Sequence, residues 1–388
     1  MKQTSGVTQA VPLLALILLT INLRPALTSV GPLLENIRAS VGMSATAAGV
    51  LNSLPLLAFA LFSPLAQFAR RFGMERTLAA VMALLAVGIL LRSQGSVTAL
   101  FGGSVVLAAG IAVGNVLMPS LIKRDYPERV QALTTIYVMC MGLASALAAG
   151  LAVPLSHWLP GGWNSALRLW AIPAAAAALF WLPLAMRCSA ERTGARVAAP
   201  AAVWRSPLAW QVTFFMGLQS LVFYVTIGWF PAIMQDAGHS ADAAGFMMTI
   251  FQILSLFVGL AMSPFLKRAR DQRLMVVLAS LMGTMPVIGL LLFPDLAYLW
   301  IVLLGLGSGG CFVLAVAFIG LRSANAYDAA SLSMMSQSIG YLLASTGPLI
   351  FGYLHDVTHG WQVPLMLVPI AGLIQAAFGM GAGRDRTV

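Results

Sequence analysis

The chain has 388 residues, of which 60% are hydrophobic and 9% are charged, against roughly 25% charged residues in ordinary soluble domains. So few charges could not cover a soluble globule of this size, and the composition also excludes a disordered chain or a nucleic-acid module, despite a pI near 10.2. Many apolar runs exceed the ~18 residues that suggest a membrane helix, and none alternates like a membrane β-strand. The composition predicts an all-α polytopic membrane protein.

The first apolar run carries one charge beside one proline. No convincing small-residue cleavage site follows this run, so we interpret it as a retained first helix and not as a signal peptide. Arg24 lies inside the run, where a charge costs about 2.5–3.5 kcal/mol and usually faces a cavity. Pro25 removes one helix hydrogen bond, so the helix is expected to break beside the charge. Snorkelling of Arg24 to the surface, or a bond to backbone carbonyls, is the alternative.

Turn residues such as Pro160-Gly161-Gly162 and Pro294-Asp295 separate twelve predicted spans. The first six are expected near residues 10–32, 44–69, 77–94, 98–122, 130–155 and 164–186. The second six are expected near residues 208–235, 241–265, 274–293, 296–321, 330–354 and 361–381.

The basic residues give an orientation to these spans. With an even number of spans both termini lie on one side, and 18 of the 22 Lys and Arg residues fall on that side. The other side receives Arg38, Arg92 and Arg168, and Arg24 lies within the first span. Since positive loops stay in the cytoplasm, both termini are predicted to be cytoplasmic.

A polar, basic segment divides the chain into two halves. Residues 1–187 are predicted to form an N-terminal six-helix bundle, residues 188–207 a cytoplasmic linker, and residues 208–388 a C-terminal six-helix bundle. The halves repeat weakly at offsets of 195 to 200 positions. Ser63-Pro64 is expected to end the second span and Ser263-Pro264 the eighth. Glycine pairs spaced by four, Gly110/Gly114 and Gly305/Gly309, recur in the fourth and tenth spans and suit close helix packing. The repeat indicates pseudo-symmetric bundles.

Six plus six helices with a basic central loop resemble the major facilitator superfamily. The loop after the second span, Arg71-Phe72-Gly73-Met74-Glu75-Arg76, is similar to the latter part of that superfamily's loop motif. An acidic residue normally precedes Arg-x-Gly there, and this chain has Arg70 in its place. The resemblance implies a cytoplasmic gating motif that contains Arg71, Gly73 and Arg76.

A narrower resemblance lies in the first span. Asn22-Leu23-Arg24-Pro25, followed by Thr28-Ser29-Val30-Gly31-Pro32-Leu33, is similar to the cyanate/2-nitroimidazole transporter branch of the superfamily. This resemblance implies a multi-pass carrier of the bacterial inner membrane, secondary active or facilitative, that works by alternating access. Its substrate would be a small polar or anionic organic compound, such as a cyanate-like anion or a nitro-heterocycle.

The placement of the acidic residues outside the interiors of the predicted spans favours an anionic ligand. All twelve fall in predicted loops or at span ends, as do the four histidines. An interior cation suits a ligand with concentrated negative charge, such as a nitro or carboxylate group. Because no acidic residue falls in the interior of a predicted span, the sequence argues against proton coupling through a buried carboxylate. It favours uniport, exchange, or symport in which the proton travels with the substrate.

Polar residues within the spans are the candidate substrate contacts. Each alone suits an interhelical hydrogen bond, whereas the set, drawn from both halves, suits a site near the membrane midplane. The predicted contacts are Arg24, Asn22, Thr28, Asn52, Asn115, Tyr137, Gln219, Tyr224, Gln252, Gln337 and Tyr341.

Other function classes fit less well. An integral membrane enzyme would need interior carboxylates, histidines or metal ligands, which the predicted spans lack, so we expect no catalytic site, cofactor or metal. A carrier for efflux of drugs or toxic compounds with broad specificity is the alternative, because the predicted lining is mostly apolar. The expected partners are a small-molecule substrate and membrane lipid, with no nucleic acid, and the chain is expected to be a monomer.

Overall fold

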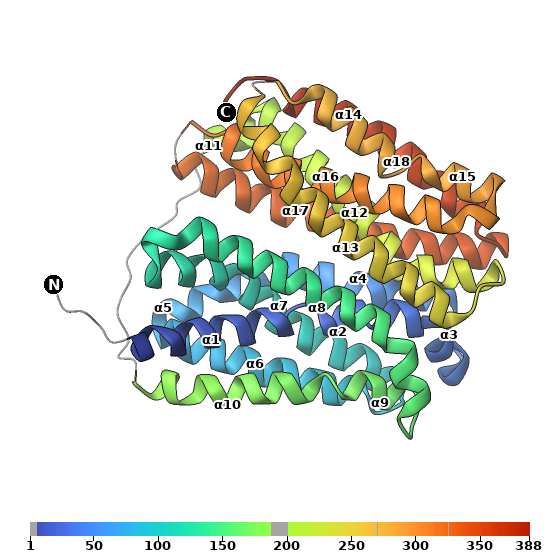
Figure 1. Cartoon of the computed structure of the whole chain (residues 1–388), viewed down its shortest axis with the longest axis horizontal. Helices are drawn as coiled ribbons and strands as arrows, with labels where there is room; N and C mark the ends of the chain where they lie inside the picture. The colour runs from blue at the N-terminus through green and yellow to red at the C-terminus, as the bar shows by residue number, and fades with distance from the viewer. Residues whose placement is uncertain (1–5, 188–200, 270, 325) are drawn as a thin grey trace. The chain divides into compact units, whose positions relative to one another are not determined.

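The structure is a computed structural model that describes residues 6–187, 201–269, 271–324 and 326–388 (Figure 1). Most of the predicted linker, residues 188–200, lies outside the described residues. Within the described ranges every regular element is a helix, in agreement with the predicted all-α class. An α-helix satisfies its own backbone polar groups, which a chain in lipid requires.

The elements of the first half are α1 (Gly6–Asn22), α2 (Pro25–Thr28), α3 (Val30–Val41), α4 (Ala45–Phe62), η1 (Ser63–Gln67), α5 (Phe68–Phe72), α6 (Met74–Arg92), α7 (Val97–Asp125), η2 (Pro127–Arg129), α8 (Val130–Trp158), α9 (Trp163–Arg168) and α10 (Ala171–Arg187). The elements of the second half are α11 (Ala201–Arg205), α12 (Pro207–Asp236), α13 (Ala241–Arg268), α14 (Arg273–Met282), α15 (Pro286–Leu292), η3 (Pro294–Leu296), α16 (Ala297–Leu321), α17 (Ala326–Thr358) and α18 (Gln362–Ala382).

The chain forms two compact units. The N-terminal unit comprises Met1–Leu33 and Leu61–Gly194, and the C-terminal unit comprises Leu34–Ala60 and Ala195–Val388. Residues 34–60, which include most of α4, therefore pack with the second half of the chain. The division into two six-helix bundles at residues 188–207 remains a prediction of domain boundaries.

The described helices lie close to the predicted positions of the spans, but fewer of them than the predicted twelve are long and apolar enough to cross a membrane. Ten are long and apolar enough to cross a membrane, and the bent pair Leu13–Thr28 and Val30–Val41 raises the number to eleven. The predicted span at residues 330–354 coincides with α17, which is 33 residues long and carries Ser331, Ser336 and Gln337 along its first half. These hydroxyl and amide groups make α17 more polar than its neighbours.

The two Ser-Pro pairs behave differently. At Ser63-Pro64 the α-helix gives way to η1, as predicted. At Ser263-Pro264 the prediction was wrong, because α13 continues to Arg268. Pro264 comes late in a long helix, and the helix passes it before it ends.

The glycine pairs lie where helices approach closely within each unit. A side chain at Gly305 or Gly309 would collide with the α13 backbone at Phe251 and Ser255. In the N-terminal unit, a Cβ at Gly110 of α7 would lie 3.2 Å from the Val81 carbonyl oxygen of α6, and a Cβ at Gly114 would lie 2.9 Å from a Leu23 side-chain carbon. Small residues at these positions let backbones meet, which is how helices pack in lipid.

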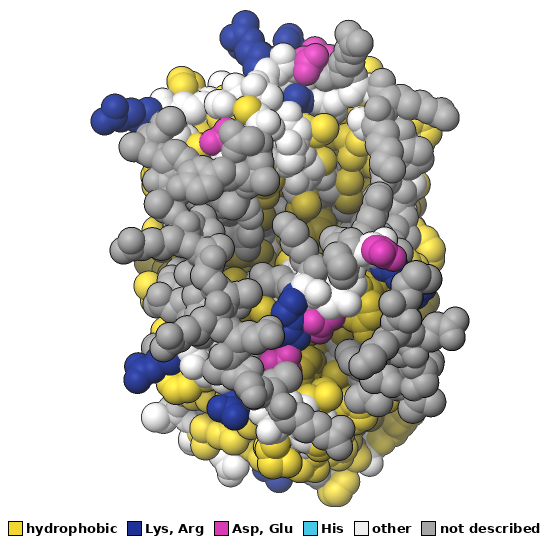
Figure 2. All heavy atoms as spheres, turned by 90° about the vertical axis from the view of Figure 1, so that its left-hand side faces the viewer, with side chains coloured by type: hydrophobic (Ala, Val, Ile, Leu, Met, Phe, Trp, Pro, Cys, Tyr) yellow, Lys and Arg dark blue, Asp and Glu magenta, His cyan; other side chains and the backbone are white. Residues whose placement is uncertain are grey.

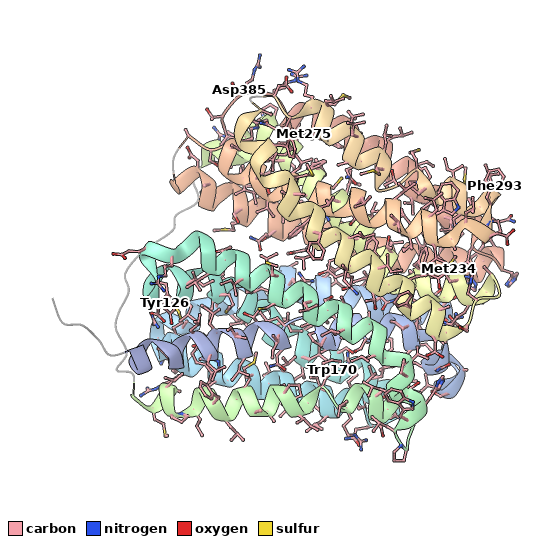
Figure 3. The ribbon with its side chains drawn as sticks, in the orientation of Figure 1. Tyr126, Trp170, Met234, Met275, Phe293 and Asp385 are labelled. Atoms are coloured by element: carbon pink, nitrogen blue, oxygen red, sulfur yellow. The ribbon has the colours of Figure 1, made fainter. Side chains whose placement is uncertain are left out.

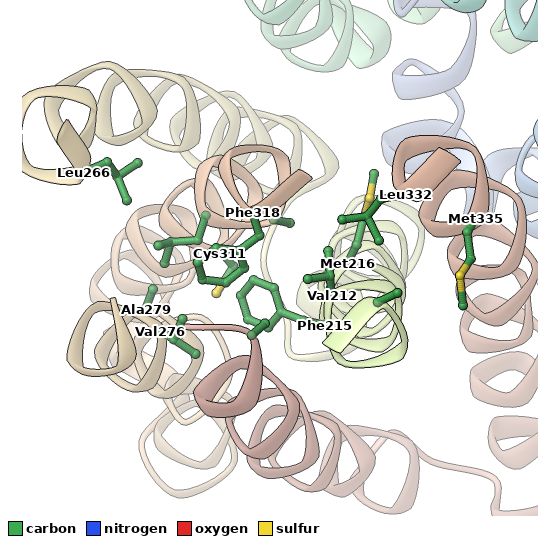
Figure 4. Close-up of a cluster of buried hydrophobic side chains, with 14 of the residues drawn as sticks. Val212, Phe215, Met216, Leu266, Val276, Ala279, Cys311, Phe318, Leu332 and Met335 are labelled. Carbon is green, nitrogen blue, oxygen red and sulfur yellow. The ribbon is translucent and has the colours of Figure 1, made fainter. Parts of the chain in front are cut away.

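The C-terminal unit has a well-defined apolar core. Phe215 and Phe318 meet with ring centroids 5.7 Å apart, and Val212, Val276 and Cys311 pack around them (Figure 4). These side chains come from α12, α14 and α16, so the cluster joins three helices far apart in the sequence. This core fixes the helices that bear the polar residues described below.

A carboxylate joins α4 to α17 inside the same unit. Asp356 accepts hydrogen bonds from the backbone N–H groups of Ala45 at 3.1 Å and Thr46 at 2.7 Å, and from the Thr46 hydroxyl at 2.5 Å. The first N–H groups of a helix lack partners within the helix, and its N-terminus favours negative charge. Asp356 therefore caps α4 from another helix.

Candidate functional site

The first membrane helix breaks at Arg24. Helix α1 ends at Asn22 and α2 begins at Pro25, so Leu23 and Arg24 form the junction. Pro25 stands at the first position of α2, where its missing N–H costs nothing and its ring prevents continuation from α1. The segments Leu13–Thr28 and Val30–Val41 then meet at 43°. The break expected beside the charge is present.

Side chains hold this break in place within the N-terminal unit. Asn22 Nδ2 donates to the Leu18 carbonyl at 2.7 Å and to the Pro173 carbonyl of α10 at 3.2 Å. The Thr28 hydroxyl donates to the Ser145 carbonyl of α8 at 3.1 Å. Asn22 and Thr28, both predicted to contact substrate, thus tie the broken segment to its neighbours. Their contact with substrate remains a prediction.

Three of the predicted contacts gather around the break. Arg24 is half-buried and lies close enough to Tyr137 of α8 for its charge to act on the phenol. The Tyr137 hydroxyl donates in turn to Asn115 Oδ1 of α7 at 3.5 Å. A cation, a phenol and an amide from three helices can together bind an anionic group and orient the rest of a small ligand.

Two of the predicted contacts in the C-terminal unit are buried amides. Gln219 of α12 accepts a hydrogen bond from the Ser220 hydroxyl at 3.3 Å, and Gln252 of α13 is also buried. Asn52 of α4 donates to the Gly228 carbonyl of α12 at 3.4 Å. Asn52 therefore makes a hydrogen bond between α4 and α12, which is the structural role that the sequence also allows for each polar residue taken alone.

The remaining predicted contacts of this unit are aromatic or exposed. Tyr224 is buried edge-on to Phe223 at 5.4 Å, and Tyr341 is half-buried edge-on to Phe59 at 5.6 Å. Gln337 is exposed and donates to Ser333 one turn earlier at 2.9 Å. Tyr341 and Gln337 lie on one helix, α17, as predicted from their spacing.

The predicted gating motif leads into α6. Gly73 precedes the helix at φ 91°, a conformation that favours glycine. Arg71 is exposed with its guanidinium 5.4 Å from the Phe72 ring, and Arg76 Nε donates to the Ala185 carbonyl of α10 at 3.1 Å. The motif therefore anchors α6 to α10, and a gating role stays a prediction.

An ion pair beside this motif was missed by sequence reasoning. Arg124, near the end of α7, donates to Glu75 Oε1 at 2.5 Å and to Asp125 Oδ1 at 2.6 Å. Tyr126, which follows them, lies at the left end of the N-terminal unit in Figure 3. Figure 2 shows Lys, Arg, Asp and Glu side chains among hydrophobic ones on the corresponding face. Glu75 is 49 positions from Arg124, so the sequence contains no local signal for the pair.

Arg92 and Ser29 were also missed as candidates. Sequence reasoning counted Arg92, near the end of the predicted span 77–94, on the outer side of the membrane, and the structure places it at the end of α6, fully buried, with Nη1 donating to the Ala26 carbonyl in α2. A charge at the end of an apolar run is typical of a membrane surface. Its burial depends on how α2 and α7 pack on α6, which spacing alone does not predict.

Within the described residues, no group of three or more His, Cys, Asp or Glu side chains is placed to hold a metal ion. The arrangement around Arg24 is suited to binding and contains no metal-ligand geometry.

Comparison with known proteins decides the family. The model of the Major Facilitator Superfamily matches residues 16–345. The chain belongs to the major facilitator superfamily. It is therefore a multi-pass membrane transporter and not an enzyme.

Relatives within the superfamily agree with the narrower resemblance. The chain is 44% identical over 387 residues to the 2-nitroimidazole transporter of Escherichia coli (strain K12), with 99% of this chain and 98% of the relative covered. It is 31% identical to the cyanate transport protein CynX of the same organism, with 89% and 90% covered. The major facilitator fold also matches a solved bacterial homologue of the human lysosomal transporter Spinster, in an inward-facing and unoccupied conformation, with a TM-score of 0.82. At 16% identity and coverage of 99% and 100%, that likeness concerns the fold alone.

Proposed function

We propose that this chain is a secondary active or facilitative carrier that moves a small polar or anionic organic compound across the bacterial inner membrane by alternating access. The compound is a cyanate-like anion or a nitro-heterocycle, and Arg24 contacts its negatively charged group. Both termini lie in the cytoplasm. The observation that carries this proposal is Arg24 at the break between α1 and α2, in a chain whose relatives are named for 2-nitroimidazole and cyanate.

The chemistry of these compounds fits the residues around the break. Cyanate is an anion, and the nitro group carries its negative charge on two oxygens, so both suit the donor fork of a guanidinium. Asn115 and Tyr137 offer an amide and a phenol to polar ring atoms. A half-helix break that brings a polar group into the membrane interior is a recurring way to build a carrier's binding site.

Transport by an Arg24→Ala variant tests the proposal. Purified protein in vesicles would be assayed for counterflow of labelled 2-nitroimidazole and of cyanate. We expect transport to fall to the level of empty vesicles, while the elution profile and melting temperature show a folded protein. Arg129→Ala is the matched control, since it removes one positive charge from an exposed position in the same unit.

Two results would overturn the proposal. Normal counterflow by Arg24→Ala would exclude the arginine contact. Stabilisation of the wild-type protein by many unrelated apolar compounds, and by neither 2-nitroimidazole nor cyanate, would favour a broad-specificity efflux carrier, because a specific ligand raises the melting temperature by binding the folded state.

A further inference from the structure

Arg92 is a second buried arginine beside the broken segment. Its side chain is 1% exposed at the end of α6. A guanidinium has five N–H donors, and within the described chain one of its nitrogens, Nη1, has a partner, the Ala26 carbonyl. Its Nε and Nη2 atoms are buried with no hydrogen-bond partner among the described residues. Most of the donor capacity of this group is therefore unused by the described protein.

The charge of Arg92 is also uncompensated. Among the described residues, the ion pairs involve Arg38, Arg124, Arg273 and His355, and none involves Arg92. Burial of a charge without partners is strongly unfavourable, and each unmade hydrogen bond adds to the cost. Ionisable groups retained in this condition inside a membrane protein are usually functional.

The unused atoms have a specific geometry. Nε–H and one Nη2–H lie parallel along one edge of the guanidinium plane, and this edge matches two oxygens held on one atom, as in a carboxylate or nitro group. The Ser29 hydroxyl is likewise buried without a hydrogen-bond partner in the described chain. Ser29 follows α2 and lies three residues after Ala26, so both are on one face of the same turn. Both unused groups therefore adjoin α2.

The backbone around Arg92 is held closely. Gly103 of α7 packs directly on the Arg92 backbone, where a Cβ would collide. Arg168 donates to the carbonyl of Ser93, the next residue, at 2.9 Å. In contrast, α2 is a single turn between the junction at Arg24 and the break at Ser29. The guanidinium is fixed from α6 and α7, while the segment covering it is short and bounded by two breaks.

We propose that the Nε/Nη2 edge of Arg92 and the Ser29 hydroxyl form a second anion-binding position, which takes the nitro or carboxylate group of the transported compound when α2 moves. This inference rests on the proposed function for its substrate class. Arg24 meets the ligand at the break, and Arg92 binds the same two-oxygen group behind the α2 turn. Arg92 is thus a specificity-determining residue for planar two-oxygen groups over linear anions.

Binding to the purified full-length chain in lipid nanodiscs tests this assignment. Titration calorimetry would compare 2-nitroimidazole, which has two oxygens on one nitrogen, with cyanate, which is linear and has one. Arg92→Lys keeps the charge and removes the fork, so we expect affinity for 2-nitroimidazole to fall about tenfold, the value of one charge-assisted hydrogen bond, and affinity for cyanate to fall less. The matched control, Arg129→Lys in η2 of the same unit, should change both by less than about twofold, as an exposed residue away from α2 and α6.

The outcomes separate this inference from the proposed function. Equal 2-nitroimidazole affinity in Arg92→Lys and Arg129→Lys overturns the second position and leaves the role of Arg24 intact. If Arg92→Lys does not fold, Ser29→Ala decides, because loss of its hydroxyl should weaken 2-nitroimidazole binding several-fold, and unchanged affinity overturns the assignment. A wild-type chain that binds neither probe overturns the substrate class and this inference together.

Discussion

Arg92 in the N-terminal unit and Arg322 in the C-terminal unit are buried almost equally, at 1% and 2% exposure, yet their surroundings are opposite. Arg322 Nε donates to the Ala382 carbonyl at 2.7 Å, and its Nη2 donates to Gln272 Oε1 and to the Gly383 carbonyl at 3.2 Å. Arg92 Nη1 donates to one carbonyl, and its other two nitrogens have no partner in the described chain.

The difference distinguishes a structural arginine from a functional one. Arg322 follows α16 and fastens the start of α14 and the end of α18, so its hydrogen bonds hold the C-terminal unit together. Burial lowers its pKa, and the charges of Asp385 and Asp271 oppose that effect; Asp385 is labelled near the C-terminal end in Figure 3. At Arg322, hydrogen-bond acceptors compensate for the burial of the charge. At Arg92 they do not, so two of its nitrogens remain available as donors to a ligand.

Replacement of each arginine by methionine, which is similar in length, should give the largest difference in unfolding free energy between the two sites. Arg322→Met leaves three buried acceptors unsatisfied, so we expect a loss of about 3–5 kcal/mol in unfolding free energy. Arg92→Met leaves one carbonyl unsatisfied but removes an unpaired buried charge, so its stability should stay within about 1 kcal/mol of the wild type or rise. Thermal unfolding without ligand measures both.

Stabilisation by the ligand should be lost in the Arg92 variant and kept in the Arg322 variant. A folded Arg92→Met protein should show little stabilisation by 2-nitroimidazole, while Arg322→Met, where it folds, should respond like the wild type. Equal destabilisation of the two variants would contradict the comparison, since it would mean that Arg92 is as well satisfied as Arg322.

Sequence reasoning predicted the break at Arg24 because a proline beside a charge has a local physical consequence. It predicted the spans for a similar reason, since apolar length is read directly from the chain. It could not separate Arg92 from Arg322, because two of the three acceptors of Arg322 are backbone carbonyls about 60 positions away, which have no sequence signature, and the third, Gln272, is 50 positions away. In the same way it did not reveal that Asn22 binds the Pro173 carbonyl. Partners that depend on tertiary packing had to come from the structure.

Asp356 is a negatively charged counterpart of Arg322, since its carboxylate has hydrogen-bond partners in the fold. Burial raises the pKa of this carboxyl group, but the hydrogen bonds from Thr46 and Ala45, with the charge of Arg38, outweigh burial and hold the pKa below its usual value. Asp356→Ala should therefore lose about 1–2 kcal/mol at neutral pH, the range for a helix cap. Because the folded pKa is the lower one, this contribution is fully present above the unfolded value of about 3.9 and is lost as the pH falls through the folded value.

Melting curves at several pH values check this prediction. The difference between the wild type and Asp356→Ala should be constant from about pH 5 to pH 8 and shrink below about pH 4. Asp295→Ala serves as the control, because Asp295 is exposed in η3 and should change stability by less than about 0.5 kcal/mol. A difference that grows on acidification would contradict the capping role.

Glu75 and Arg124 complete the range, because they satisfy each other in a pair whose carboxylate is buried and whose guanidinium is partly exposed. Hydrogen bonds from Arg124 to Asp125 and Glu75 raise its pKa above the usual value, and its side chain is 37% exposed. A glutamine at position 75 still offers Arg124 an acceptor oxygen, and Arg124 keeps Asp125, so Glu75→Gln removes only the charge attraction of one partly exposed pair, about 0–1 kcal/mol. Glu75→Gln should therefore cost about 0.5 kcal/mol or less in low salt, with no measurable cost in 1 M salt, where screening acts over about 3 Å. Melting temperatures in both salts measure this difference. A salt-insensitive loss above about 1 kcal/mol would instead place Glu75 with Arg322, among the charges whose partners hold the fold.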